Sequence, residues 1–361
     1  MKRFVSAAVA VLTAAMSLGG AVPVRPAVAA EVSFTHNEWT GKNGAEDIFA
    51  VNREDASVNA VPYQSEEAAA NAVWDYNARE QSEYLQMLTG ERENWMLTVV
   101  QNADQAQRHL DYALSTSSIS PDSNWKTVQL PKSWTCQGFD FPIYSNISQP
   151  WQARYDSNVP VPNAPTNYNP VGVYQKVFTP DSAMLKSGRR TYIEFDGVES
   201  AYYVYLNGKA VGYSEDSFSP HRFDITDYLR DGENSLVVEV HKFCDGTWFE
   251  DQDMIYDGGI FRDVFLVSAP EVQIRDYKVN TTLDSLYTDA ELEIALDIRN
   301  LTGNAKNGMS VTAAAYDEDG RNILTGASVG LSEIAAGQSG TAVIKTNVTC
   351  PKLWSAETPN I

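Results

Sequence analysis

The chain has 361 residues, and its 27 Lys and Arg against 47 Asp and Glu give a formal net charge of −20 at pH 7. A surface this acidic repels phosphate groups, so we expect neither nucleic acid nor an anionic membrane surface as a partner. Hydrophobic residues make up 43% of the chain, which is enough for packed cores. The length fits about two to three domains at ~100–200 residues each.

The first 30 residues have the features of a secretory signal. Lys2 and Arg3 precede an uncharged run from Phe4 to about Leu18, and small residues at 27–30 offer a cleavage site. The alternative is an uncleaved membrane anchor, but the run is rich in Ala, Gly and Ser and poor in Leu, Ile and Phe. We therefore predict a signal peptide over 1–30, secretion to the extracellular space, and no membrane insertion after cleavage.

Residues 31–88 are predicted to form a polar N-terminal arm with one short helix. Ser65 can cap that helix, because the strong helix formers of 66–70 follow it directly. The run Trp95–Val100 is then the first expected strand of a sandwich. Seven prolines between Pro131 and Pro170 predict long ordered connections, since proline fixes φ and donates no ladder hydrogen bond.

Short strands separated by turns fill the stretch from Asp196 to Val267. Ala201–Leu206 carries large side chains on both faces and is therefore expected inside a sheet covered on both sides. Asn207-Gly208 follows at once and predicts a hairpin, because both central residues of a type I′ turn need positive φ. Further expected elements are the strands Lys209–Tyr213, Ser235–His241 and Ile260–Val267, with a helical or turn segment at Asp224–Leu229.

A second sandwich is expected after Pro270. In 291–299, apolar residues at even positions alternate with charged residues at odd positions, apart from Ala295, as in a half-buried strand. Val311–Tyr316 and Thr341–Val348 are two more predicted strands. The pattern is typical of an immunoglobulin-like domain.

Ordered short motifs in this chain resemble those of β-galactosidases of glycoside hydrolase family 2. The motifs follow the family's order and spacing, and the last two are characteristic of the β-galactosidase branch. They are Gly138-Phe139-Asp140-Phe141-Pro142-Ile143-Tyr144-Ser145-Asn146, Asn169-Pro170-Val171-Gly172-Val173-Tyr174, Phe195-Asp196-Gly197-Val198, Asn207-Gly208, Gly212-Tyr213-Ser214-Glu215-Asp216-Ser217, Phe223-Asp224-Ile225, Gly232-Glu233-Asn234, Glu250-Asp251-Gln252-Asp253-Met254 and Gly259-Ile260-Phe261-Arg262-Asp263-Val264.

The resemblance implies an all-β fold in two domains. A jelly-roll sugar-binding sandwich is expected over 89–269, and an incomplete immunoglobulin-like sandwich over 270–361. In the family a (β/α)8 catalytic barrel follows, so the chain is expected to stop before it. The full-length family enzyme is also expected to use sodium and magnesium and can form homo-oligomers.

The implied activity is hydrolysis of terminal β-D-galactosides, as glycosides or oligosaccharides, by a retaining mechanism. Such enzymes use two carboxylates about 5–5.5 Å apart. By resemblance both are glutamates of the missing barrel. We therefore expect no catalytic residue in this chain and no activity from the chain alone.

Asp216 is the leading candidate for a substrate-binding residue. An ionised carboxylate can hold adjacent sugar hydroxyls or help to ligate a hard cation. In the resembled family the aspartate at this place in the motif contacts galactose and a sodium ion. The alternative is an aspartate that only caps a turn.

Asn146 is the second substrate-binding candidate. Its amide can both donate and accept hydrogen bonds, which suits a pair of hydroxyls, and the family's matching asparagine contacts substrate. The chain departs from the family pattern close by, at Gln149-Pro150 and in the insertion Trp151–Asn158. An asparagine that only stabilises its loop is the alternative.

Other polar groups are predicted to be structural. These include the acidic run Glu250–Asp253, the four histidines (His36, His109, His221 and His241), and an ion pair between Arg262 and Asp263. Cys136, Cys244 and Cys350 are far apart and lack metal-ligand spacing, so they are expected as free buried thiols, with a Cys136–Cys244 bridge as the alternative.

Two further functions remain open from the sequence. The chain could be a non-catalytic carbohydrate-binding module, with a sugar-stacking platform drawn from the aromatic residues Tyr202, Tyr203, Tyr205, Trp248 and Phe249. It could also belong to another family 2 glycosidase, a β-glucuronidase or a β-mannosidase. The motifs Glu250–Met254 and Gly259–Val264 argue for the β-galactosidase.

Overall fold

The computed structural model describes residues 7–11, 34, 51–72, 81–152, 155–250, 253–317, 320–324 and 327–360. The chain divides into two compact units. The larger unit comprises 28–56 and 86–268, and the smaller comprises 1–27, 57–85 and 269–361. The expected N-terminal arm therefore contributes to both units, while the domain limits expected from the sequence stay predictions.

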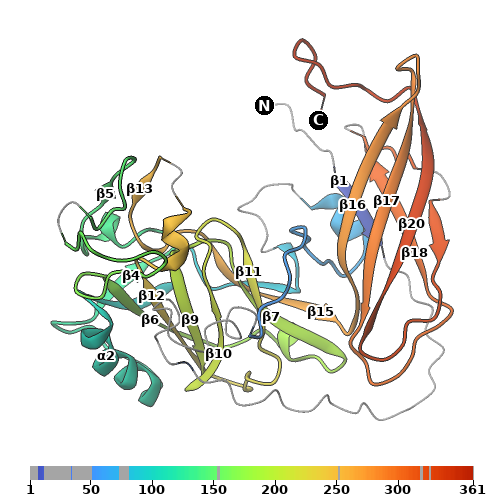
Figure 1. The fold of residues 1–361 in the computed structure, drawn as a ribbon. Coiled ribbons are helices and arrows are strands. Elements are labelled where there is room, and N and C mark those ends of the chain that lie inside the picture. Colours follow the sequence, from blue (N-terminus) through green and yellow to red (C-terminus); the bar gives the residue numbers. More distant parts are fainter. Residues whose placement is uncertain are drawn as a thin grey trace. The chain divides into compact units, whose positions relative to one another are not determined.

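Two antiparallel sheets form the larger unit (Figure 1). The six-stranded sheet has the order β10-β9-β12-β6-β3-β4 and the four-stranded sheet has the order β11-β7-β15-β2. The strands of the first are β3 (Asn94–Val100), β4 (Lys126–Gln129), β6 (Val171–Phe178), β9 (Ala201–Leu206), β10 (Lys209–Ser214) and β12 (Asn234–His241). Those of the second are β2 (Leu85–Met87), β7 (Arg189–Phe195), β11 (His221–Asp224) and β15 (Val264–Pro270).

Among its described residues, this unit also has two short ribbons and three 3₁₀ helices. The ribbons pair β5 with β13 and β8 with β14. Their bounds are β5 (Ile143–Tyr144), β8 (Val198–Glu199), β13 (Ile255–Tyr256) and β14 (Gly259–Ile260). The 3₁₀ helices are η3 (Thr135–Gln137), η4 (Ser182–Leu185) and η5 (Asp245–Trp248).

The hairpin at the centre of the sequence is confirmed. β9 has the predicted bounds, and all six of its residues are buried. Asn207 and Gly208 have φ of 56° and 78°, and Lys209 pairs with Leu206 across the turn. β9 also pairs with β12, so it is an interior strand whose side chains pack into both layers of the core.

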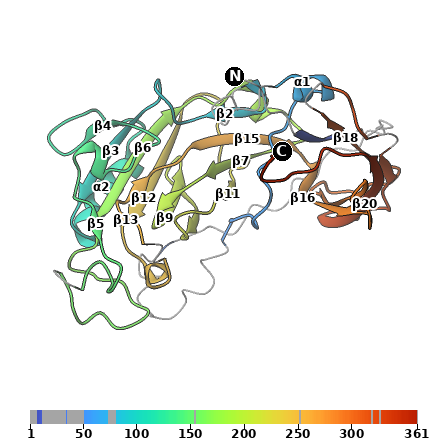
Figure 2. The same ribbon diagram turned by 90° about the horizontal axis from the view of Figure 1, so that it is seen from above.

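A helix that the strand patterns did not predict covers the outer face of the six-stranded sheet (Figure 2). α2 (Ala103–Ser115) begins after Asn102, whose side chain accepts a hydrogen bond from the Gln105 amide. Its buried residues Ala106, His109, Leu110 and Ala113 follow a helical period and pack among Trp125, Val173 and Tyr203. The sheet is thereby buried on both faces.

The smaller unit is also built mainly from strands. One sheet has the order β16-β17-β20, with β16 (Val272–Leu283), β17 (Asp289–Asn300) and β20 (Gln338–Thr349). The other has the order β1-β18-β19, with β1 (Ala7–Val11), β18 (Ser310–Tyr316) and β19 (Ser328–Gly330). The alternation predicted for 291–299 is confirmed, since Ile294, Leu296 and Ile298 enter the core between these sheets.

The short helix of the arm is confirmed as α1 (Glu66–Asn71), and the Ser65 side chain accepts a hydrogen bond from the Ala68 amide. β1 falls inside the predicted signal peptide. The rest of that segment lies outside the described residues, so the signal stays a prediction. No helix among the described residues combines the length and the apolar character that crossing a membrane requires.

Two local predictions were wrong. Ile260–Val267 is not one strand, because the chain turns at 261–263 between β14 and β15. The three cysteines are free, but Cys136 and Cys350 are exposed and only Cys244 is buried, so the alternative bridge is absent as well. The expected strand began too early, because its pattern did not reveal the turn between β14 and β15.

Candidate functional site

The turn that follows β10 carries Asp216. Asp216 is exposed and has a φ of 82°, a conformation that non-glycine residues adopt rarely. Its Oδ1 accepts a long hydrogen bond of 3.4 Å from the Phe218 amide. This contact is the one expected of a turn cap, while the exposure leaves the carboxylate accessible to a ligand. The geometry of Asp216 is thus compatible with a substrate-binding residue and also with an aspartate that only caps a turn.

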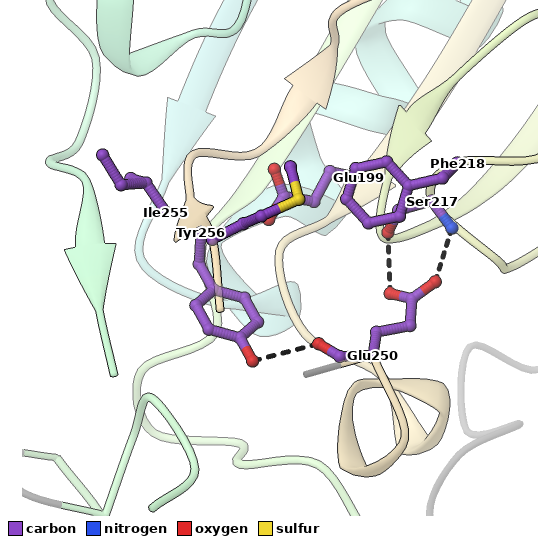
Figure 3. A pocket seen from close by; sticks show the side chains of 7 residues that line it. Glu199, Ser217, Phe218, Glu250, Ile255 and Tyr256 are labelled. Carbon is purple, nitrogen blue, oxygen red and sulfur yellow. Dashed lines mark hydrogen bonds between the residues drawn. The ribbon is translucent and has the colours of Figure 1, made fainter. Parts of the chain in front are cut away.

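A second carboxylate holds this turn in place. Ser217 is fully buried, and Glu250 accepts hydrogen bonds from both its amide, at 2.6 Å, and its hydroxyl, at 2.7 Å (Figure 3). The Tyr256 hydroxyl donates to the carbonyl of Glu250 at 3.0 Å. Burial raises the pKa of Glu250 above its usual range. The acidic run thus has a structural contact in its first residue, as predicted, whereas Asp251 lies outside the described residues.

A small cavity lies beside the Glu250–Ser217 contact (Figure 3). Its volume of about 10 Å³ corresponds to about one water molecule, so it is far too small for a sugar. It is lined by Glu199, Ser217, Phe218, Glu250, Met254, Ile255 and Tyr256.

Asn146 lies in an exposed turn two residues after β5. β5 pairs with β13, which places Tyr144 opposite Ile255, and the Tyr144 hydroxyl donates to Asp253 at 2.6 Å. Ile255 and Ser217 line the cavity, whereas Asn146 and Asp216 do not line it themselves. Among the described residues no hydrogen bond joins Asn146 to Asp216.

A buried ion pair anchors the loop that leads to Asn146. The Lys242 ammonium lies 2.6 Å from the Asp140 carboxylate, and both side chains are buried. Lys242 also donates to the Phe141 carbonyl at 2.8 Å, and the Tyr168 hydroxyl donates to Asp140. Sequence reasoning missed Lys242, because its partner lies about a hundred residues away.

One group of side chains in the described part of the chain has the spacing of metal ligands. Glu215, Cys244 and Asp245 offer ligand atoms that all lie within 4.8 Å of one another. Burial, together with the hydrogen-bonded Asp245 carboxylate, raises the pKa of Glu215 to about 8. Burial also raises the pKa of the Cys244 thiol. Glu215 and Cys244 therefore hold their protons at neutral pH, which suits a hydrogen-bonded group better than a cation site.

Glu199 is a buried carboxyl group that also lines the cavity. Its Oε2 accepts hydrogen bonds from the amides of Asp257 and Gly258, at 3.1 and 2.9 Å. Burial is the main cause that raises the pKa of Glu199 from 4.5 to about 7. The Glu199 carboxyl group thus stays protonated up to neutral pH, and it accepts the two hydrogen bonds that hold the turn between β13 and β14.

This pKa predicts a pH dependence of stability. Between pH 4.5 and 7 the folded protein keeps a proton on Glu199 that the unfolded chain loses, so this stabilisation is complete below pH 4.5 and is lost as the pH rises to 7. Urea unfolding at several pH values should show a decline of up to about 1.4 kcal/mol per pH unit from this group. Glu199→Gln keeps an oxygen for both amides and should remove this part of the slope. Glu215 adds a decline of the same sign, so the difference between the two proteins is the quantity to compare.

Two structural expectations fail or lose support at this site. Arg262 and Asp263 do not pair. Instead Arg262 donates to the carbonyls of Asp196 and Phe218, and Asp263 accepts from the Thr89 hydroxyl. The proposed sugar-stacking platform loses support, because Tyr202, Tyr203 and Tyr205 are buried. Of its other two residues, Trp248 is half-buried and Phe249 is exposed.

The described histidines have structural surroundings, as predicted. His109 is buried on α2, and His241 is buried beside Glu239. Burial and the positive charge of Arg53 lower the pKa of His221 to about 4, against the opposing effect of Asp216. His36 lies outside the described residues.

Comparisons with known proteins identify the two units. The profile of the sugar-binding domain of glycosyl hydrolases family 2 matches residues 94–270, and the profile of glycosyl hydrolases family 2 matches residues 272–361. The chain belongs to glycosyl hydrolase family 2. The resemblance read from its motifs and the all-β fold are thereby confirmed.

Several β-galactosidases are similar over much of this chain. A β-galactosidase of Priestia megaterium is 38% identical over 90% of this chain and 29% of its own length. A β-galactosidase of Vibrio cholerae is 37% identical over 68% of this chain and 24% of its own length. The chain thus spans less than a third of the curated relatives that it matches.

Solved family 2 structures share the fold at low sequence identity. The match to a β-glucuronidase of Bacteroides uniformis has a TM-score of 0.55 and 21% sequence identity. It covers 76% of this chain and 29% of the β-glucuronidase chain. The match to a family 2 member of Bacteroides cellulosilyticus has a TM-score of 0.50 and 17% sequence identity. It covers 76% of this chain and 33% of that family member's chain.

Proposed function

We propose that this chain is the N-terminal region of a secreted β-galactosidase that hydrolyses terminal β-D-galactosides with retention of configuration. The observation that carries the proposal is the identity of 37–38% to β-galactosidases over 68–90% of the chain. The solved β-glucuronidase at 21% identity supports the shared fold and says nothing about the sugar.

Within that enzyme the jelly roll contributes contacts to the sugar, and the acid/base and nucleophile carboxylates are supplied outside this chain. Asp216 accepts hydrogen bonds from sugar hydroxyls, and Asn146 adds an amide from a neighbouring loop. Both side chains are exposed and so open to a ligand, which supports this assignment. By itself the chain is then expected to be inactive.

Sodium is the proposed cation at Asp216. The residue fits a hard cation in part, because an exposed carboxylate offers an anionic oxygen, and Oδ2 accepts no hydrogen bond from the described residues. One side chain cannot complete a coordination shell, so the other ligands would come from beyond this chain. Magnesium is proposed only for the whole enzyme.

Asp216→Asn in the whole enzyme tests the assignment. The amide keeps the shape of the side chain but loses charge-assisted hydrogen bonds worth roughly 1.5–3 kcal/mol each, so kcat/KM for nitrophenyl galactoside should fall about tenfold or more. The sodium concentration for half-maximal rate should rise. Asp231→Asn removes the same charge from another exposed turn and should leave both quantities unchanged. Normal kinetics in the Asp216 variant would show that this aspartate only caps a turn.

A further inference from the structure

Two residues from other segments, Arg262 and Glu250, hold the turn around Asp216 through hydrogen bonds. Arg262 donates to the Phe218 carbonyl at 2.6 Å and fixes the far end. Glu250 receives both polar hydrogens of Ser217, the residue directly after Asp216. The hydrogen bond that Asp216 itself makes, at 3.4 Å to the Phe218 amide, is much weaker by its length. The conformation of Asp216 is therefore set mainly by its neighbour.

Asp216 needs such an anchor because of its backbone. A φ of 82° costs on the order of 1–2 kcal/mol for a residue with a Cβ, and such a conformation persists only where the surroundings impose it. The carboxylate of Glu250 can impose it, since two hydrogen bonds at 2.6 and 2.7 Å fix both the position and the rotation of Ser217. Charge-assisted bonds of this kind are about twice as strong as neutral ones.

Hydrogen bonds of its own backbone hold Glu250 in place. It lies two residues after η5, its amide donates to the Gly246 carbonyl at 3.1 Å, and its carbonyl accepts from the Tyr256 hydroxyl. Its side chain spans from this segment to the turn after β10 (Figure 3). Glu250 therefore links a hydrogen-bonded segment to the turn that presents Asp216.

We propose that Glu250 is a positioning residue that orients the Asp216 carboxylate toward substrate by accepting two hydrogen bonds from Ser217. This inference rests on the proposed role of Asp216 and adds a residue that the acidic run otherwise leaves without function. Glu250 does not touch the sugar or the cation in this proposal, and its effect reaches them only through Asp216.

The first test needs only this chain and does not depend on the enzyme's activity. Glu250→Ala removes both acceptors of Ser217, and hydrogen exchange of the Ser217 amide should accelerate about tenfold or more. Glu250→Gln can still accept from the amide and donate to the hydroxyl, so its exchange should stay near the wild-type rate. Glu233→Ala removes an exposed glutamate from another turn and is the control. Unchanged exchange in Glu250→Ala would overturn the proposal.

The second test separates positioning from general structural support. In the whole enzyme Glu250→Ala should lower kcat/KM for nitrophenyl galactoside about tenfold, with Glu250→Gln restoring most of the rate. In an Asp216→Asn background the same change should have little further effect, because the residue it positions has already lost its charge. Equal losses in both backgrounds would overturn the proposal. If Asp216→Asn alone leaves the kinetics unchanged, the proposed function of Asp216 fails, and the positioning role fails with it.

Discussion

Lys242→Met is expected to lower the free energy of unfolding of the larger unit by about 3–5 kcal/mol, because it leaves the Asp140 carboxylate buried without its counter-charge. The exposed fraction of the Lys242 side chain is 0% and that of Asp140 is 7%, so water cannot replace the lost partner. Methionine fills a similar volume, which separates the electrostatic loss from a cavity. Urea unfolding followed by tryptophan fluorescence measures the change.

The double variant Asp140→Asn with Lys242→Met is the matched control. It removes both charges, and the asparagine can still accept a hydrogen bond from the Tyr168 hydroxyl. Replacing both members of a buried pair often costs little, so the double variant should recover most of the stability lost by Lys242→Met. A double variant as unstable as the single one would show that the loss does not come from an unpaired Asp140 charge, and would point to the lost hydrogen bond from Lys242 to the Phe141 carbonyl.

Local signals in the sequence predicted the central hairpin. Asn207 and Gly208 set the turn through their own backbone preferences, and the apolar pattern of Ala201–Leu206 set the strand, so neither needed knowledge of distant residues. The same local chemistry predicted α1 through Ser65. α2 was missed although Asn102 caps it and Ala106, Leu110 and Ala113 keep helical spacing. The strand patterns on both sides led us to expect strands alone, although the spacing of these residues is helical.

The candidate site was predictable only where one segment carries the information. The turn that exposes Asp216 follows from the motif around it, whereas the contact from Glu250 to Ser217 spans 33 residues and depends on tertiary structure. The ion pair expected between Arg262 and Asp263 was wrong for a related reason. Both residues lie where the chain turns between β14 and β15, and each has its hydrogen-bond partner on a different segment.

Gly258→Ala is expected to be another strongly destabilising substitution, because two unfavourable effects coincide. Gly258 has a φ of 90°, which costs on the order of 1–2 kcal/mol once a Cβ is present. That Cβ would also lie 2.4 Å from the buried Trp134 ring, and overpacking of this kind typically costs about 1–3 kcal/mol. The Gly258 amide donates to Glu199, so the turn cannot move away without losing a buried hydrogen bond.

Gly232→Ala separates the two effects in the same unit. Gly232 has a φ of 97°, but its added Cβ would meet no atom within 4 Å, so only the backbone cost of about 1–2 kcal/mol applies. Urea unfolding should therefore place Gly258→Ala about 1–3 kcal/mol below Gly232→Ala, a difference that reports the clash with Trp134 alone. Equal losses in the two variants would contradict the close packing of Trp134 against this turn. A larger loss for Gly258→Ala would show that the Trp134 ring packs too closely against this turn to admit a methyl group.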